Sequence, residues 1–429
     1  MSPPSDGVTT TKRARENSHF GTRARNDVND LDQDNGHSIA RARANGSAGT
    51  LSTYAYWGLS ISFVLAGIAL NIQPSRFIHV YFVAFGFLTT LGLGGLFFVL
   101  LHHLVKSRWS VLACRQMQWV ANLLPWCMVL FLPNLLWAQE IFPWMNMGGT
   151  AYLAEADHRG YLKAAWFFSR SGVYFTVWTG LVWAYKNQKS QIEGSRESDR
   201  CQQWRRRLSG PAMVLFGITT TFAGFDWFMS LQPHWHSAIF GVYVFAGAVP
   251  AALSVLALFT IQLERLGVVH PDSNVATRHD IGKLLFGFIL FWAYIAFSQY
   301  LLIWYAGMRA ETSFYTLRLS KPWLATTLWL VVLHFAVPFA VLISATAKRS
   351  PLVLLIASLV ILLAHALDIF WLVMPALENG HSHWGSADIA PAVFALSTLS
   401  LALAKGIRSE SQLSQQAPEY TNLEPLATL

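Results

Sequence analysis

Charged residues are scarce in this chain, and their scarcity limits what kind of protein it can be. Asp, Glu, Lys and Arg together make up 13% of its 429 residues, whereas ordinary soluble domains carry about 25%. Hydrophobic residues make up 53%. This composition excludes a soluble enzyme and a disordered protein, and it is typical of an integral membrane protein.

Cysteine is also rare, which excludes several kinds of site. The chain has only Cys114, Cys127 and Cys201, with no CxxC pair among them. A disulfide scaffold, a zinc site and a cysteine-ligated iron–sulfur cluster each need more thiolates than this. His334 and His365 leave one bis-histidine haem as the remaining option. We expect the chain to hold no metal and no redox cofactor of its own.

The charge balance is basic, at 31 Lys and Arg against 23 Asp and Glu, for a net charge of +8. In a soluble protein such a balance would suggest nucleic acid. The chain shows no nucleic-acid recognition module, so we expect no nucleic-acid binding. Cationic loops on the cytoplasmic face of a membrane are the better explanation.

Ten apolar runs follow a polar N-terminal stretch, and each is near the roughly 20 residues that cross a bilayer. Residues 1–50 are predicted to be a disordered cytoplasmic tail because they have no apolar period. The predicted spans are Leu51–Ile72, Phe77–Val105, Met117–Trp137, Ala164–Tyr185, Pro211–Leu231, Ser237–Leu263, Ile281–Tyr305, Trp323–Ile343, Pro351–Pro375 and Ile389–Ala404.

The loop charges agree with that count. If the N-terminus lies inside, the inner segments carry roughly four times as many Lys and Arg as the outer ones, which is a strong positive-inside signal. Both termini are therefore predicted to be cytoplasmic. Among Lys and Arg, only Arg170 lies deep within a predicted span, and Lys283 lies at the inner end of another.

A repeat is suggested by two similar stretches. GFDWFMSLQPHWHS contains Asp226, and ALDIFWLVMPALENGHSHW contains Asp368, each followed by Trp and His. The sequence thus predicts an all-α integral membrane protein with two four-helix bundles, formed by helices two to five and six to nine. The predicted boundaries are 51–76 for the first helix, 77–236 and 237–384 for the bundles, and 385–429 for the last helix and a cytoplasmic tail.

A few ionisable groups fall inside the spans, where each costs about 2.5–3.5 kcal/mol on insertion scales. Arg170 and Asp226 are predicted at similar depth, so we expect them to pair. His365 and Asp368 lie three apart on one helix face, and His334 lies nearer the midplane. Because histidine titrates near neutral pH, these five residues form a candidate proton path. The alternative is that they only fix helix packing.

Threonines at 89, 90, 219, 220 and 221 offer a further polar track. Threonine hydroxyls in membrane helices usually bond their own backbone, so this track carries little weight by itself.

Three stretches together resemble the ActF-type membrane subunits of bacterial alternative complex III, which are relatives of the polysulfide-reductase-type (NrfD-like) membrane subunits. They are TFAGFDWFMSLQPHWHSAIFGVYVFAG, HDIGKLLFGFILFWAYIAFSQYLLIWYA and HHLVKSRWS. The similarity runs from about residue 51 to 408. It departs after Ala306, where an Asn-Ile-Pro-Glu-Glu-Thr-like turn is replaced by GMRAETSFY.

The resemblance implies a multi-pass subunit of a quinol-oxidising respiratory complex in the bacterial inner membrane. It implies two partner subunits that carry the c-type haems and iron–sulfur clusters, a multihaem cytochrome and an iron–sulfur protein. It also implies a sister NrfD-like subunit that holds the quinol site. It also implies a cofactor-free chain that offers a proton path and has no catalytic residues of its own.

Three alternatives stay open at this point. In the first, the chain itself binds quinol near the outer face, with His79, Arg170 and Asp226 holding the head group. The second is a standalone secondary transporter, since transporters also use internal repeats. The third is a purely structural scaffold.

Overall fold

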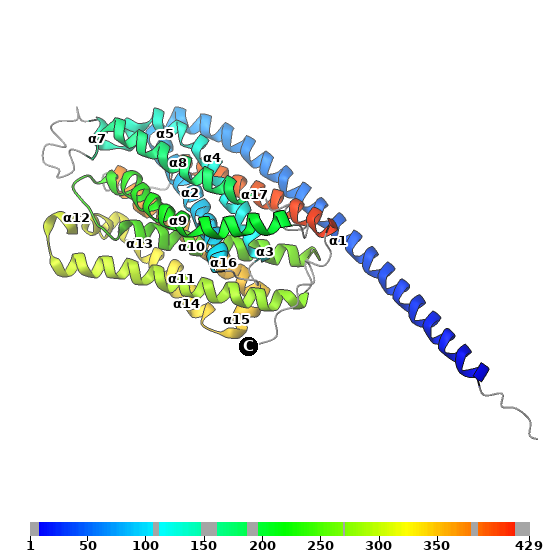
Figure 1. The fold of residues 1–429 in the computed structure, drawn as a ribbon. Coiled ribbons are helices and arrows are strands. Elements are labelled where there is room, and N and C mark those ends of the chain that lie inside the picture. The colour runs from blue at the N-terminus through cyan, green and yellow to red at the C-terminus, as the bar shows by residue number, and fades with distance from the viewer. Residues whose placement is uncertain are drawn as a thin grey trace, which may run out of the picture.

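A computed structural model of the chain describes residues 8–105, 111–146, 161–186, 196–268, 271–378 and 385–416, with the side chains of most residues from Ile39 onward. Within these ranges all regular elements are helices. Figure 1 shows them lying lengthwise beside one another between two ends, which we call the α12 end and the α15 end after the short helices found there. The predicted all-α class is therefore confirmed for the described part of the chain.

Nine helices in these ranges are long and apolar enough to cross a bilayer, and they match nine of the ten predicted spans. The protein is accordingly an all-α, multi-pass membrane protein. The nine spans are Ala42–Ile72, Pro74–Val105, Ala113–Leu136, Gln203–Leu231, Phe240–Arg265, Val275–Ala306, Lys321–Leu342, Pro351–Leu377 and Ser386–Gln412.

Most of these spans correspond to one helix, and two are built from shorter pieces. The single helices are α1 (Val8–Ile72), α2 (Pro74–Val105), α9 (Arg196–Trp227), α10 (Phe240–Arg265), α11 (Pro271–Ala306), α16 (Pro351–Leu377) and α17 (Ile389–Gln416). The pieces are α3 (Val111–Ala121), α4 (Leu123–Leu130) and α5 (Leu132–Leu136), and then α13 (Lys321–Val331), η4 (Val332–Ala336) and α14 (Val337–Leu342).

The fourth predicted span, Ala164–Tyr185, is not among these nine. Its residues do form a helix, α8 (Ala164–Lys186). Arg170 and the Ser, Thr, Tyr and Trp side chains of α8 lower its mean hydropathy, and α8 is not among the nine apolar spans. A tenth crossing at α8 remains a prediction.

The first span begins earlier than predicted, at Ala42 rather than Leu51. Ala44 and Ala48 are buried in a cluster that includes Ile407 of α17, and α17 is the helix along which α1 packs. Their small side chains let the helix backbones approach closely, a packing that apolar periodicity alone does not reveal. The helix of the first span therefore extends into the predicted N-terminal tail, and the side chains before residue 39 lie outside the described residues.

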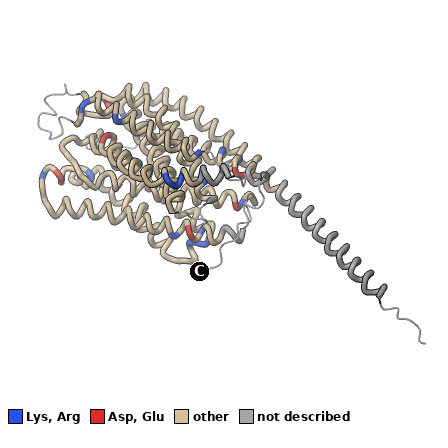
Figure 2. Tube along the Cα trace, viewed as in Figure 1, with Lys and Arg blue, Asp and Glu red and all other residues tan. Residues whose placement is uncertain are grey.

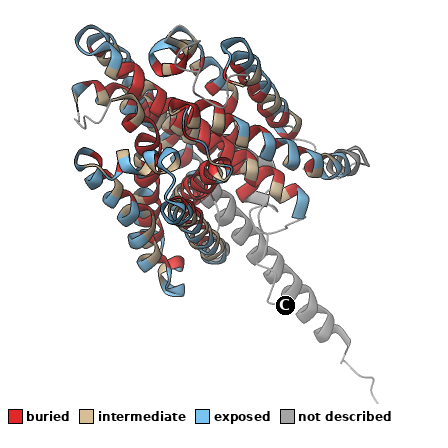
Figure 3. Ribbon diagram, turned by 90° about the vertical axis from the view of Figure 1, so that its left-hand side faces the viewer, coloured by how far each residue is buried: buried red, intermediate tan, exposed pale blue. Residues whose placement is uncertain are grey.

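The centre of the molecule is formed by α2 and α10, the two most deeply buried of the nine spans. They contact each other and α16. A Cβ on Gly94 of α2 would stand 2.4 Å from the carbonyl oxygen of Ala248, so only glycine permits this approach. Figure 3 shows buried residues filling the centre and exposed ones lying on the outer helices.

The helix contacts only partly support the division into two bundles. α2 packs on α3, α4, α8 and α9, while α10 packs on α11 and α16, as two separate units would. However, α2 also packs closely against α10 and α16. The two-bundle arrangement, with its boundaries at 77–236 and 237–384, therefore remains a prediction.

Most charged residues lie toward the two ends of the helices, as Figure 2 shows. At the α12 end, Arg76 of α2 bonds Glu378 at 2.7 Å and Asp388 of η5 (Ser386–Asp388) at 2.8 Å. This clamp ties the start of α2 to the end of α16 and the start of α17. Charged residues at the helix ends, with apolar residues between them, are the distribution expected of a protein that spans a bilayer.

Candidate functional site

Arg170 and Asp226 form a bidentate ion pair between α8 and the end of α9. Arg170 donates from Nε to Oδ2 and from Nη2 to Oδ1 of Asp226, both at 2.8 Å. The Asp226 side chain is fully buried, and the Tyr174 hydroxyl donates to its Oδ2 at 2.6 Å. The predicted pairing is therefore confirmed. Parallel N–H···O bonds of this kind hold both charges in one fixed geometry.

Tyr161 completes this pair at the α12 end. The Arg170 guanidinium carbon lies 3.9 Å from the Tyr161 ring centroid, and Nη1 donates to the Tyr161 carbonyl oxygen at 3.2 Å. Burial raises the pKa of the Tyr161 phenol above its usual range. The ring therefore acts as an aromatic face for the cation and keeps its own proton.

An apolar cavity of about 280 Å³ lies next to this pair. Tyr161, Phe222, Phe225, Met229 and Trp235 form most of its wall, and Ser230, His236 and Ser237 add polar groups. Ser230 also donates to the Asp226 backbone carbonyl oxygen. His79, Arg170 and Asp226, which the quinol-binding alternative assigns to the head group, are not among the residues that line this cavity. His79 is buried in α2, and its Nδ1 has no hydrogen-bond partner in the described residues.

Asp368 occupies a different environment, deep in α16 with 2% of its surface exposed. The Tyr243 hydroxyl donates to its Oδ1, and the Trp292 indole N–H donates to its Oδ2 at 3.2 Å. Both donors are neutral. Among the described residues only His334 approaches it as a potential cation, with Nδ1 4.0 Å from Oδ2. Asp226 thus has a permanent counter-charge, whereas Asp368 has only a titratable one.

His334 is placed by a π-helical turn, η4, in the middle of its span. Pro338 follows four residues later and has no N–H to donate to the His334 carbonyl, which favours a local departure from α-helical bonding. The imidazole stacks on Trp292 with ring centroids 3.9 Å apart and planes 14° apart. Neither ring nitrogen has a hydrogen-bond partner in the described residues. Single π turns of this kind are frequent at functional sites.

His365 continues the same cluster toward α2. Its Nε2 lies 2.8 Å from the Thr90 hydroxyl oxygen, and its ring centroid is 6.3 Å from that of His334. Gly247 lets α10 lie close against Asp368 and His365 of α16. A Cβ at position 247 would stand 3.1 Å from Asp368 Oδ2 and 3.3 Å from His365 Nδ1. We call Tyr243, Asp368, Trp292, His334, His365 and Thr90 the Asp368 cluster.

The described residues contain no group of three or more His, Cys, Asp or Glu side chains that would hold a metal ion. A bis-histidine haem between His334 and His365 does not fit this packing. Trp292 covers the face of one ring, and Thr90 is bonded to Nε2 of the other. Both would have to leave before a porphyrin could be seated.

Arg318, at the end of α12 (Arg309–Arg318), is a buried cation that pairs with no carboxylate among the described residues. It donates to the carbonyl oxygens of Trp371 at 3.1 Å and Leu372 at 2.8 Å, and its guanidinium carbon lies 3.5 Å from the Phe314 ring centroid. Burial lowers the pKa of Arg318 to about 9. These contacts fix α12 to α16 one turn beyond Asp368.

The two aspartates, two of the histidines and the Arg170 partner of Asp226 could be found from the sequence, but the neutral hydrogen-bond donors to the two carboxyls were missed. Tyr174, Tyr243 and Trp292 were given no role from the sequence. One signal was available: a tyrosine or tryptophan in the middle of an apolar helix needs a hydrogen-bond partner when buried. A buried carboxyl on a neighbouring helix is such a partner.

The fold and the buried polar groups define a class, namely a multi-pass helical membrane protein with ionisable clusters inside its spans. Comparison with known proteins adds no family to this class, because no family model matches the chain and no curated protein matches it.

Proposed function

We propose that this chain is a proton-handling membrane subunit of a quinol-oxidising respiratory complex, with no redox cofactor of its own. The proton-handling part of this proposal rests on the surroundings of Asp368. This buried carboxyl is bonded by neutral donors and has two histidines beside it. Its placement in such a complex rests on the sequence resemblance to the ActF-type membrane subunits of alternative complex III.

Charge balance separates the two aspartates. An isolated carboxylate is costly in a low-dielectric interior, so it is either paired or neutralised by a proton. Arg170 already balances Asp226 through two hydrogen bonds. Asp368 is left to bind a proton itself or to share one with His334. In this proposal, Asp368 therefore exchanges the proton and the Arg170–Asp226 pair stays fixed.

The remaining members of the Asp368 cluster have distinct parts in this proposal. Tyr243 and Trp292 hold the two carboxyl oxygens, so loss or gain of a proton does not require the side chain to move far. His334, 4.0 Å from the carboxyl, receives the proton, and His365 passes it to the Thr90 hydroxyl. Neither His334 nitrogen has a direct hydrogen-bond partner in the described residues, so in this proposal the proton reaches and leaves His334 through bridging water.

The test uses the complex as it exists in native membranes, isolated through a tag on this chain. Quinol-driven electron transfer and proton movement are measured in proteoliposomes for wild type and Asp368→Asn. We expect proton movement to fall at least about ten-fold, since general acid–base groups typically contribute 10²–10⁴-fold. Asp280→Asn makes the same chemical change at a carboxyl that is 31% exposed and pairs with Lys283, so it serves as the matched control.

Two results count against the proposal. Unchanged proton movement in Asp368→Asn, with normal assembly, would remove the proton-handling role. Recovery of the chain without haem-containing or iron–sulfur partners would remove the respiratory assignment and favour a standalone transporter.

A second candidate function, quinol binding by this chain, is favoured by the cavity beside Tyr161. Its aromatic walls suit a flat ring, and Ser230, His236 and Ser237 offer hydrogen bonds to ring oxygens. A photoreactive quinone analogue should then label Tyr161 or Trp235 in the purified chain. Labelling of a sister subunit alone would dismiss this candidate.

A further inference from the structure

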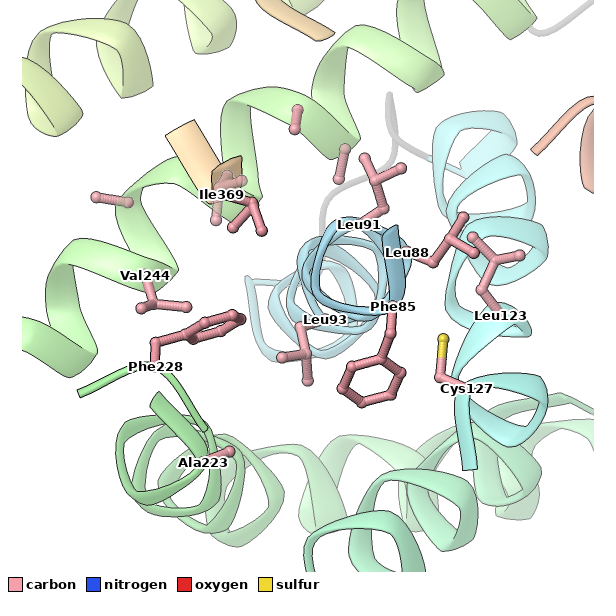
Figure 4. Packing of buried hydrophobic residues seen from close by; sticks show 14 of the residues in the cluster. Phe85, Leu88, Leu91, Leu93, Leu123, Cys127, Ala223, Phe228, Val244 and Ile369 are labelled. Carbon is pink, nitrogen blue, oxygen red and sulfur yellow. The ribbon is translucent and has the colours of Figure 1, made fainter. Parts of the chain in front are cut away.

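A small cavity of about 10 Å³ lies between α2, α9 and α10, away from the larger one at the α12 end. Its lining includes Leu93 of α2, Ala223 of α9, Phe228 just after α9 and Val244 of α10, and these four side chains are labelled in Figure 4. Three threonines, Thr89, Thr90 and Thr220, also line it. A space of this size takes one water molecule when polar partners are present, whereas apolar cavities stay dry.

The three hydroxyls are not equivalent. Thr89 donates to the Phe85 carbonyl oxygen at 2.8 Å and Thr90 to that of Gly86 at 2.9 Å, as threonines in helices usually do. Thr220 is 3% exposed, yet its hydroxyl oxygen has no hydrogen-bond partner in the described residues. A buried hydroxyl without a partner is costly, so this one requires a ligand that the protein itself does not provide.

We infer that one water molecule binds in this cavity and bridges Thr220 of α9 to the Thr89 and Thr90 hydroxyls of α2. The hydrogen count fits. Thr220 donates its one hydroxyl proton to the water, and the water donates its two protons to the lone pairs of Thr89 and Thr90. The water then makes three hydrogen bonds, which is the usual number for a buried water.

This water extends the Asp368 cluster across the helix interface. Thr90 already contacts His365 Nε2 at 2.8 Å, so the chain of hydrogen-bonding groups runs from the imidazole through Thr90 and the water to Thr220. The binding of the water stands on the cavity and on Thr220 alone. Only its use as a stepping stone for protons rests on the proposed function.

The test determines the structure of the chain in lipid nanodiscs at a resolution that shows ordered water, for wild type, Thr220→Val and Thr220→Ser. We expect density within hydrogen-bond distance of the Thr220 hydroxyl in wild type and Thr220→Ser, and loss of that density in Thr220→Val. Well-defined density for the three threonines with none between them would overturn the inference.

Thermal unfolding provides a second readout that does not depend on activity. If the water is bound, Thr220→Val removes a satisfied hydroxyl and the unfolding midpoint falls, while Thr220→Ser stays close to wild type. If Thr220 is simply unsatisfied, the valine variant is at least as stable as wild type, and the inference fails. Thr176→Val is the matched control, because the exposed Thr176 hydroxyl donates to the Gly172 carbonyl oxygen of its own helix.

Discussion

The ring of His334 stacks on that of Trp292 with centroids 3.9 Å apart, and Trp292 donates its indole N–H to Asp368 at 3.2 Å. One tryptophan therefore fixes both the histidine and the carboxyl that stand beside each other in the middle of the protein. The relationship connects three helical segments, η4, α11 and α16. It gives the Asp368 cluster a defined geometry without any permanent positive charge.

The ion pair between Arg170 and Asp226 should be mainly structural. Breaking a buried pair by removing one partner costs about 3–5 kcal/mol, because the remaining charge is left uncompensated. We therefore expect Arg170→Gln and Asp226→Asn each to lower the unfolding midpoint strongly. The double variant should recover part of that loss. Additive losses in a double-mutant cycle would show that the two side chains are not coupled.

Gly247 should tolerate no larger residue. A Cβ there would press on Asp368 Oδ2 and His365 Nδ1, at 3.1 and 3.3 Å, and overpacking of this kind costs about 1–3 kcal/mol. Gly247→Ala is expected to reduce both stability and proton movement. Gly180→Ala in α8 is the control, since nothing lies within 4 Å of its Cβ position. If Gly247→Ala and Gly180→Ala had the same stability and the same proton movement, that result would contradict the close packing of α10 on α16.

Arg318→Lys should destabilise the protein although the charge is kept. The guanidinium donates to the carbonyl oxygens of Trp371, Leu372 and Phe314 while its carbon lies 3.5 Å from the Phe314 ring centroid. An ammonium cannot reproduce this planar set, and each buried acceptor left unsatisfied costs about 1–3 kcal/mol. Thermal unfolding measures the loss. A midpoint equal to wild type would show that these bonds contribute nothing.

The two ends of the molecule should face opposite sides of the membrane. Arg206→Cys, exposed on α9, and Met308→Cys, 52% exposed next to α12, are placed at the α15 side and the α12 end. With Cys201 replaced by Ser, the native Cys114 and Cys127 are buried and should not react. A membrane-impermeant maleimide should label Met308→Cys from the periplasm and Arg206→Cys only in inverted vesicles. Labelling of both from one side would contradict the topology.

The spans were predictable because the bilayer imposes a length and an apolar composition that a single sequence displays. The pairing of Arg170 with Asp226 was also predictable, because an unpaired charge at that depth is costly and the two lie at matching positions. The start of the first span was not predictable. It depends on the packing of Ala44 and Ala48 in a cluster with Ile407 of α17, a helix far from α1 in sequence.

The hydrogen-bond partners in the Asp368 cluster could not be predicted from the sequence either, because they too depend on contacts between helices far apart in the chain. His365 and Asp368 share a helix face, yet they bond different partners, Thr90 of α2 and Tyr243 of α10. Which helices surround a buried carboxyl is decided by packing. Hydropathy and spacing report only the depth of each residue along its own helix.

Infrared difference spectroscopy on the lipid-reconstituted complex tests most directly whether Asp368 exchanges a proton, because a protonated carboxyl has a C=O stretching band that an ionised one lacks. We predict a carboxylic-acid band that changes when quinol is added, that disappears in Asp368→Asn and that persists in Asp226→Asn. A quinol-dependent band that is retained in Asp368→Asn, or its absence from wild type, would contradict proton exchange at Asp368.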